Sequence, residues 1–452
     1  MQRTYNSIVV LGAGESGNGA AILAKQQGLP VFVSDNGKIK EQYRKELEAE
    51  DIAFEEGGHD TERIMAADLI IKSPGIPEKA PLIKALRTAG KEIISEIEFG
   101  YWYKGEGKII AITGSNGKST TTSLLYYLLK SAGLDVSMVG NIGISFAKQV
   151  AQKPTAWYVM EISSFQLDDI QTFRPEIGVL LNITPDHLDR YEYQFERYVN
   201  SKFRIARNQT AEDLLVVNVD DPAIGAYLTQ HIFKPKIIPI TMSEHNLTQD
   251  DGAFMKDEEM HLRYRGDDTN LSIHDLALKG RHNQYNSMAA GISAMASGIR
   301  KEKIRESFST FEGLEHRLEF VATIRGVDFI NDSKGTNLNS VWFALESMKQ
   351  PVVLILGGQD KGNDYNEIMD LVQEKVRAIV CMGVDNAPIH KAFEHVIKNI
   401  VDTGSAVDAV KAAYALAEKG DVVLLSPGCA SFDLFKNYED RGTQFKQAVR
   451  EL

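Results

Sequence analysis

The chain has 452 residues, of which 43% are hydrophobic and 25% charged, and its formal net charge is −12. This composition is ordinary for a globular protein, and the length exceeds what one core usually serves, so we expect two or three domains. The acidic excess argues against a nucleic-acid partner but leaves room for an anionic substrate in a local basic pocket. No signal peptide or membrane span fits the sequence, and Cys381 and Cys429 lack metal-ligand spacing. We therefore expect a cytoplasmic protein with reduced, packed thiols.

The first segment carries a dinucleotide fingerprint. An apolar strand at 8–11 runs into Gly-Ala-Gly-Glu-Ser-Gly at 12–17, and the next strand ends at Asp35. Gly-x-Gly-x-x-Gly between a strand and a helix, with an acid about twenty residues on, is typical of a Rossmann-like nucleotide site. Further strands are expected at 69–72 and 92–94. Taken alone, this fingerprint favours an NAD-dependent dehydrogenase.

The most informative sequence is Thr-Gly-Ser-Asn-Gly-Lys-Ser-Thr at 113–120, which follows an apolar strand at 109–112 and opens a helical segment. In such a turn, backbone N–H groups and the positive helix end face a polyphosphate, a lysine reaches its terminal phosphates and a hydroxyl ligates magnesium. Lys118 and Ser119 fill the last two roles. The loop is a variant, because Ile112 stands where the generic pattern has its first glycine. We predict an ATP site here, in preference to a turn that only caps a helix.

Two downstream segments add polar chemistry at strand ends. Glu161 ends an apolar strand, and an acid there, beside a phosphate loop, can hold magnesium together with Ser119. The segment 182–191 places His187 among two aspartates and an arginine, which suits a catalytic loop, although a capped turn with a surface histidine has the same composition.

Lys202 lies inside the apolar stripe of a predicted helix over 194–208. Burial would lower its pKa and leave a neutral amine that can take up carbon dioxide as a carbamate, an anionic ligand for a second magnesium. Periodicity alone favours the other outcome, in which the side chain snorkels to the helix edge.

The rest of the chain predicts a further α/β unit. Asn283 and Asn286 lie one helical turn apart and suit purine or ribose contacts, or a helix cap. Glycine-rich polar loops follow three strands, at 331–337, 357–361 and 426–433, as expected of a binding crevice. The predicted fold is therefore α/β with three domains: Rossmann-like (1–98), a central P-loop-type ATPase with a mostly parallel sheet (99–313), and a second Rossmann-like unit (314–452).

Together these segments resemble the Mur ligases, the ATP-dependent amide-forming enzymes of peptidoglycan synthesis. The matching segments occur in order across nearly the whole chain, and the displaced glycine of the phosphate loop is the family's own form. They are 113–120, the Glu161 segment, 182–191, 280–286, 315–317, 331–337 and 424–445. The last of these is similar to the D-glutamate-adding branch. The resemblance implies a monomeric ligase that adds D-glutamate to UDP-N-acetylmuramoyl-L-alanine through an acyl phosphate, giving ADP and phosphate.

The resemblance also implies a role for each site residue. The uridine diphosphate would contact Gly12, Gly14, Ser16, Asp35, Asn36, Ser73 and Gly75. ATP would contact Gly114, Asn116, Gly117, Lys118, Ser119, Thr120, Asn283, Arg317 and Asp332. One magnesium would be held by Ser119 and Glu161, and a second by His187 and carbamylated Lys202. The muramoyl-alanine part would contact Asn141 and His187, and D-glutamate would contact Lys334, Thr336, Lys361, Ser431 and Tyr438. The groups nearest the chemistry would be Lys118, Glu161, His187 and Lys202.

Other functions compete with this interpretation. Within the same chemistry, the chain could use another amino acid or be a folylpolyglutamate-type synthetase. The fingerprint at 12–17 keeps open an NAD-dependent dehydrogenase, which leaves the loop at 113–120 unexplained. A non-catalytic nucleotide-binding regulator is disfavoured by the number of polar loops at strand ends.

Overall fold

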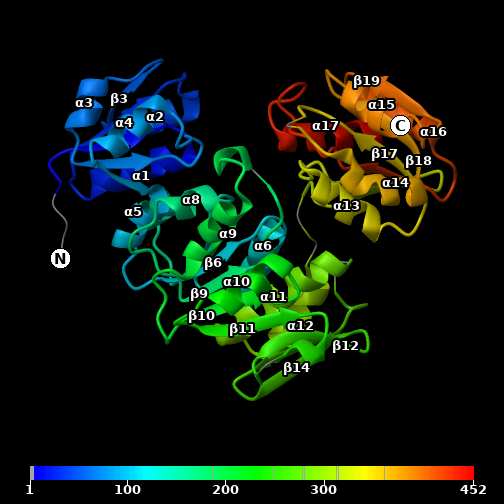
Figure 1. The fold of residues 1–452 in the computed structure, drawn as a ribbon, viewed down its shortest axis with the longest axis horizontal. Helices are drawn as coiled ribbons and strands as arrows, with labels where there is room; N and C mark the ends of the chain where they lie inside the picture. Colours follow the sequence, from blue (N-terminus) through cyan, green and yellow to red (C-terminus); the bar gives the residue numbers. More distant parts are fainter. Residues whose placement is uncertain are drawn as a thin grey trace. The chain divides into compact units, whose positions relative to one another are not determined.

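The computed structural model describes residues 5–186, 188–247, 249–276, 278, 280–311, 313, 315–360 and 362–452. Within them the strands form three α/β sheets (Figure 1), which confirms the predicted fold class. The chain divides into two compact units, one of residues 1–276 and 284–311, the other of residues 277–283 and 312–452. The domain limits 1–98, 99–313 and 314–452 stay predictions.

The first sheet is parallel and has the strand order β3-β2-β1-β4-β5. Its strands are β1 (Ile8–Leu11), β2 (Val31–Asp35), β3 (Ala53–Glu56), β4 (Leu69–Lys72) and β5 (Glu92–Ser95). The intervening helices are α1 (Glu15–Gln26), α2 (Glu41–Ala49), α3 (Thr61–Ala66) and α4 (Pro81–Thr88), and α5 (Glu96–Tyr103) follows β5. Alternate residues of β1 belong to two different core clusters, so apolar side chains cover both faces of the sheet, as a doubly wound fold requires.

The second sheet has the order β14-β13-β12-β11-β10-β9-β6-β8-β7. Its parallel part consists of β6 (Lys108–Thr113), β7 (Val136–Gly140), β8 (Trp157–Glu161), β9 (Ile177–Leu180), β10 (Leu214–Asn218), β11 (Lys236–Thr241) and β12 (Gly252–Lys256). At one edge of this sheet β12 pairs antiparallel with β13 (Glu259–Tyr264), and β13 pairs antiparallel with β14 (Asp267–Ser272).

The helices of this part are α6 (Lys118–Ser131), α7 (Phe146–Gln152), α8 (Ser164–Asp168), α9 (Phe195–Phe203), α10 (Pro222–Gln230), α11 (Arg281–Ala296) and α12 (Lys301–Thr310). Short 3-10 turns lie at Leu188–Arg190, Arg204–Ala206 and Glu244–Asn246. Helix α1 packs on α7, and one apolar cluster contains residues of both sheets. This shared core explains why the first two sheets form one compact unit.

The third sheet belongs to the second unit and has the order β15-β16-β20-β17-β18-β19. Its strands are β15 (Glu319–Ile324), β16 (Val327–Asn331), β17 (Val352–Leu356), β18 (Val376–Met382), β19 (Ile400–Thr403) and β20 (Val422–Leu425). All neighbours are parallel except β15, which forms an antiparallel hairpin with β16. The helices are α13 (Leu338–Ser347), α14 (Met369–Lys375), α15 (Ala387–Phe393), α16 (Ala406–Leu416) and α17 (Tyr438–Arg450), with a 3-10 turn at Tyr365–Ile368.

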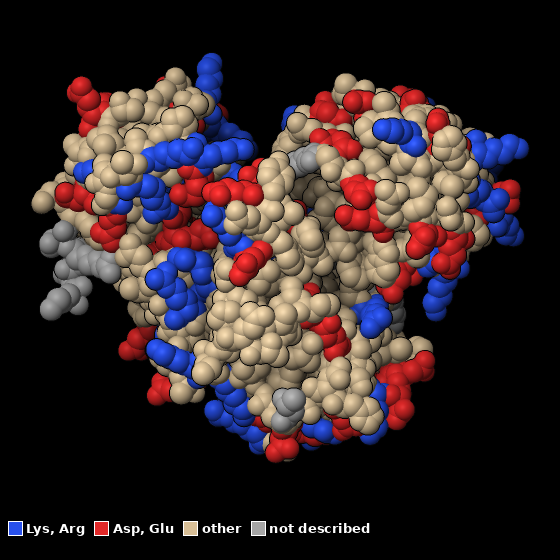
Figure 2. Space-filling model, in the orientation of Figure 1, with Lys and Arg blue, Asp and Glu red and all other residues tan. Residues whose placement is uncertain are grey.

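Two further observations concern the surface. Acidic and basic side chains are intermixed on the face shown in Figure 2, so the net charge of −12 is not displayed there as a single acidic patch. Among the residues that the structure describes, no helix combines the length and hydropathy that a bilayer-spanning segment needs.

Candidate active site

The predicted catalytic segments meet because their strands are neighbours. In the second sheet β9, β6, β8 and β7 lie side by side and parallel, so the loops at their carboxyl ends gather at one edge. A cavity of about 320 Å³ lies there. Its lining includes Lys118, Asn141 and Lys202, three residues predicted from the sequence to act on substrate, ATP or metal.

The phosphate loop is fixed mainly by Asn182, which follows β9. Asn182 Oδ1 accepts from Asn116 N at 2.8 Å, and its Nδ2 donates to Asn116 O at 3.0 Å. Gly117 caps α6 with φ +80°, a left-handed conformation that glycine adopts without strain. The loop therefore has the strand–turn–helix geometry of a phosphate cradle.

The terminal nitrogens of two lysines converge on one carbonyl of this loop. Lys118 Nζ donates to Gly114 O and to Ser115 O, each at 2.8 Å, and Lys202 Nζ donates to Gly114 O at 2.7 Å. Lys202 is 1% exposed, and its Nζ lies 4.5 Å from the centre of the Tyr198 ring. The expectation that this lysine snorkels to the helix edge is wrong, because α9 points it into the cavity beside β6.

The environment of Lys202 favours its neutral form. Burial, and then the positive charge of Lys118, lower the pKa of Lys202 well below its usual value, although nearby carboxylates oppose the shift. A neutral amine is a nucleophile, whereas an ammonium group is not. The side chain therefore has the chemistry that carbamate formation needs.

Glu161 at the end of β8 offers a magnesium ligand. Its Oε1 accepts from Asn141 Nδ2 at 2.8 Å, and its Oε2 is buried with no hydrogen-bond partner in the part of the chain that the structure describes. Ser119, in the first turn of α6, is also buried. A buried carboxylate oxygen without a donor is costly unless a cation binds it, so this donor set fits magnesium.

Arg190 links the first sheet to the rim of the same cavity. Its guanidinium donates to Pro74 O at 2.8 Å and Gly75 O at 3.3 Å, and lies 4.3 Å from the centre of the Phe165 ring. Pro74, Gly75, Phe165 and Arg190 all line the cavity. The loop after β4, predicted to bind the uridine diphosphate, therefore reaches the catalytic loops of the second sheet.

The glycine-rich turn after β1 is built around Asp35. Asp35 Oδ2 accepts from Ala13 N at 2.7 Å, and its Oδ1 accepts from Gly37 N at 2.8 Å. Ser73 Oγ donates to Gly12 O at 3.2 Å, which joins the turns after β1 and β4. Gly14 and Asn36 are exposed at this edge, and Ser16 is half-buried. These predicted contacts thus share one edge of the first sheet.

In the second unit, most of the predicted residues that the structure describes follow β16 or β20. Asp332 is buried, accepts from Ser426 Oγ at 2.9 Å and pairs with Arg317 at 3.6 Å; burial raises the pKa of its carboxyl. Lys334 Nζ lies 5.2 Å from the centre of the Tyr438 ring. Ser431 is buried and Thr336 exposed in the same group of loops.

The sequence predicted no role for Arg441, although this arginine belongs to the segment 424–445 that resembles the family. This arginine is fully buried. It donates through Nε to Ser333 Oγ at 3.0 Å, through Nη2 to Ser333 O at 2.9 Å and through Nη1 to Cys429 O at 3.2 Å. One guanidinium therefore holds together the loops 331–337 and 426–433, which carry three of the predicted D-glutamate contacts, Lys334, Thr336 and Ser431. Burial lowers its pKa to about 10.

Comparison with known proteins agrees with these segments. Models of the Mur ligase middle domain, the Mur ligase glutamate ligase domain and the MurD N-terminal domain match residues 112–294, 316–429 and 7–81. The chain is 54% identical over 446 residues to UDP-N-acetylmuramoylalanine–D-glutamate ligase of Bacteroides fragilis, covering 98% of the chain and 99% of that protein. It is 50% identical over 453 residues to the enzyme of the same name from Porphyromonas gingivalis, covering all of both. The chain belongs to the Mur ligase family.

Solved Mur-type ligases share the fold at low sequence identity. A pseudomurein peptide ligase type C from Methanothermus fervidus aligns with TM-score 0.62 and 20% identity over 99% of each chain. UDP-N-acetylmuramate–alanine ligase from Thermotoga maritima aligns with TM-score 0.60 and 18% identity, again over 99% of each chain. At this identity the likeness concerns the architecture only.

Membership of the Mur ligase family removes two of the competing functions. The dehydrogenase and regulator hypotheses are wrong, because the family consists of ATP-dependent ligases. The individual roles of the site residues stay predictions. His187 and Lys361 lie outside the described residues, while Asn283 and Asn286 are buried in α11, and Thr120 is buried in α6. Asn182, Arg190 and Arg441 were missed; their only signal was a place in a polar segment after a strand, or in the first turn of a helix.

Proposed function

We propose that this Mur ligase joins D-glutamate to UDP-N-acetylmuramoyl-L-alanine while ATP is converted to ADP and phosphate. The observation that carries the proposal is similarity at 50–54% identity, over the whole chain, to ligases named for that reaction. The cavity at the carboxyl ends of β6 and β8 supports it, because a phosphate loop, a buried carboxylate and two lysines lie together there.

The first step makes a carboxylate reactive. A carboxylate oxygen of the alanine attacks the γ-phosphorus of ATP, the bond to the β-phosphate oxygen breaks, and ADP leaves with that electron pair. The Lys118 ammonium exchanges its loop carbonyls for phosphoryl oxygens and offsets their growing negative charge. The product is an acyl phosphate.

The second step forms the amide. The neutral amine of D-glutamate attacks the carbonyl carbon of the acyl phosphate, the carbon–oxygen bond breaks, phosphate leaves and the nitrogen loses its proton. In this proposal D-glutamate is held by Lys334, Thr336, Lys361, Ser431 and Tyr438, and Arg441 keeps the loops after β16 and β20 in place.

Magnesium ions would supply charge neutralisation of the phosphates when bound. Ser119 and Glu161 would hold one ion, and His187 and Lys202 a second. For the second, the neutral Lys202 nitrogen attacks the carbon of carbon dioxide and releases a proton, which leaves an anionic carbamate. The buried, unpartnered Glu161 Oε2 and the lowered pKa of Lys202 support these assignments within the described residues.

An amino-acid panel tests the reaction. ADP release by the full chain is measured with ATP, magnesium and UDP-N-acetylmuramoyl-L-alanine, while D-glutamate, L-glutamate, L-alanine and meso-diaminopimelate are offered in turn. We expect release only with D-glutamate, and its loss in Lys118→Ala with thermal unfolding unchanged. Release driven by another amino acid would replace the proposed substrate, and undiminished release in Lys118→Ala would refute the proposed ATP site.

The monomeric state and the cytoplasmic location of the protein stay predictions.

A further inference from the structure

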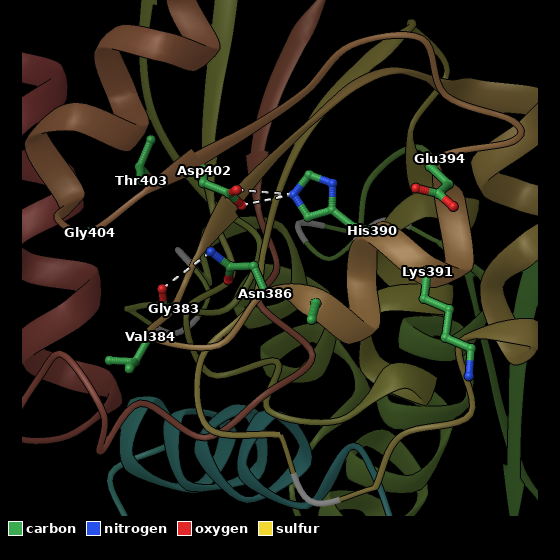
Figure 3. A pocket seen from close by; sticks show the side chains of 10 residues that line it. Gly383, Val384, Asn386, His390, Lys391, Glu394, Asp402, Thr403 and Gly404 are labelled. Carbon is green, nitrogen blue, oxygen red and sulfur yellow. Dashed lines mark hydrogen bonds and ion pairs between the residues drawn. The ribbon is translucent and has the colours of Figure 1, made fainter.

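A second cavity, of about 780 Å³, opens in the second unit, and none of the predicted site residues that the structure describes lines it. It lies at the carboxyl ends of β18 and β19 and is bounded by the loop 383–387 and helix α15 (Figure 3). Its lining includes His390 on α15 and Asp402 on β19. The function proposed above makes no use of this cavity.

Three side chains of different chemistry lie close together beside this cavity, and two of them, His390 and Asp402, line it. The Cys381 thiol, an imidazole nitrogen of His390 and a carboxylate oxygen of Asp402 all lie within 4.8 Å of one another. His390 Nε2 lies 3.0 Å from Asp402 Oδ1 and 3.1 Å from Oδ2. Cys381 is a free, fully buried thiol at the end of β18. Two adjacent strands and one helix therefore deliver a sulfur, a nitrogen and an oxygen to one point.

This donor set suits a borderline transition ion and not magnesium. Zinc-like ions bind thiolate sulfur at about 2.3 Å and imidazole nitrogen or carboxylate oxygen at about 2.0–2.2 Å, usually in a tetrahedron. Magnesium prefers oxygen ligands throughout. Corners of such a tetrahedron lie roughly 3.3–3.8 Å apart, so ligands within 4.8 Å need to approach by only about 1 Å.

The three ligands differ in freedom in a way that allows this approach. The His390 and Asp402 side chains are 35% and 58% exposed, so they can close on a fixed point. Cys381 provides that fixed point, since β18 is paired on both sides, with β17 and β19. His390 and Asp402 line the cavity, so water in it can reach an ion that they hold. An ion there would tie the edge strand β19 and helix α15 to the interior of the sheet.

We propose that Cys381, His390 and Asp402 form a binding site for a divalent transition ion such as Zn²⁺, with water as the fourth ligand. Binding breaks the S–H bond and releases the proton to solvent. The thiolate that remains donates an electron pair to the metal ion. The alternative, a surface His–Asp pair above an inert thiol, is the other outcome of the test.

Cobalt(II) is the probe, because a thiolate ligand gives it a near-ultraviolet charge-transfer band. The full chain is stripped with a chelator and titrated with Co²⁺ without nucleotide or magnesium. We expect one equivalent per chain to develop the band, and Zn²⁺ to abolish it. Cys381→Ser should lose the band at every cobalt concentration, and Asp402→Asn and His390→Gln should keep it with affinity weakened at least about tenfold.

Two matched controls separate this site from chance binding. Cys429→Ser removes the other buried thiol, and His395→Gln removes an exposed histidine close in sequence; both should titrate as wild type. Absence of the band at stoichiometric cobalt, or a band that survives in Cys381→Ser, would overturn the proposal. Wild-type affinity in both Asp402→Asn and His390→Gln would do the same. Asp402→Asn alters an exposed side chain, so it tests the site even where Cys381→Ser fails to fold.

Discussion

Substituting Gly117 with alanine should introduce both backbone strain and steric overlap into the phosphate loop, and a control at a second glycine separates the two effects. Gly117 has φ +80°, and an added Cβ would lie 3.1 Å from Asn286 Cγ and closer still to Asn286 Oδ1. The left-handed conformation costs an L-residue about 1–2 kcal/mol, and overpacking a buried contact costs a further 1–3 kcal/mol, roughly. We therefore expect Gly117→Ala to destabilise the fold by about 2–5 kcal/mol.

Gly133, just beyond the other end of α6, is the matched control. Its φ is +83°, and nothing lies within 4 Å of an added Cβ. Gly133→Ala should therefore carry the backbone cost alone, about 1–2 kcal/mol. The difference between the two variants measures the contact with Asn286.

Thermal unfolding and ADP release read out the two effects. We expect a larger fall in melting temperature for Gly117→Ala than for Gly133→Ala, together with a rise in KM for ATP seen only in the former. Adding Asn286→Ala should make Gly117→Ala less costly than it is in the wild-type background, since the overlap is gone. Equal destabilisation by the two glycine variants, or no coupling to Asn286, would refute the reasoning.

Three further predictions follow from the same unit. Lys202→Met should lower ADP release at least about tenfold, and removing carbon dioxide and bicarbonate should slow the wild-type chain but not this variant. Arg190→Ala loses two charge-assisted bonds to the loop after β4, so KM for the UDP-linked substrate should rise about tenfold with kcat little changed. Burial raises the pKa of Glu96 from 4.5 to about 7, so its ionisation opposes folding, and stability should fall as pH rises through this window. Glu96→Gln should remove that fall, which is about 3 kcal/mol in full, as unfolding at pH 5 and pH 8 will show.

Local signals in the sequence were enough for the sheets and the phosphate loop. Apolar runs that end in glycine-rich turns predicted the strands before 12–17 and 113–120 and the helices after them, because strand, turn and helix follow one another directly there. The hairpin partner β15 was not predicted. Its residues are only partly buried or exposed, so the strand carries no clear apolar pattern.

Site features that depend on distant parts of the chain were beyond local reasoning. Periodicity placed Lys202 in an apolar stripe but could not show that its acceptor, Gly114 O, lies 88 residues away. The same limit applies to Arg441, which bonds across 108 residues to Ser333. Spacing in the sequence also gave Cys381 no metal partners, because its neighbours in space come from a helix and the next strand.

The shared acceptor, Gly114 O, makes Lys118 and Lys202 interdependent. A second positive charge beside the Lys118 ammonium would be repelled in this buried setting, which adds to burial in lowering the pKa of Lys202. A phosphate in the loop would draw Lys118 away from that carbonyl and leave it to Lys202. A carbamate on Lys202 would go further, because it turns repulsion between the two side chains into attraction. In the proposed function the carbamate would also help to hold magnesium, so with magnesium present carbon dioxide should improve ATP binding in the wild-type chain, and the Lys202→Met variant should show no such dependence.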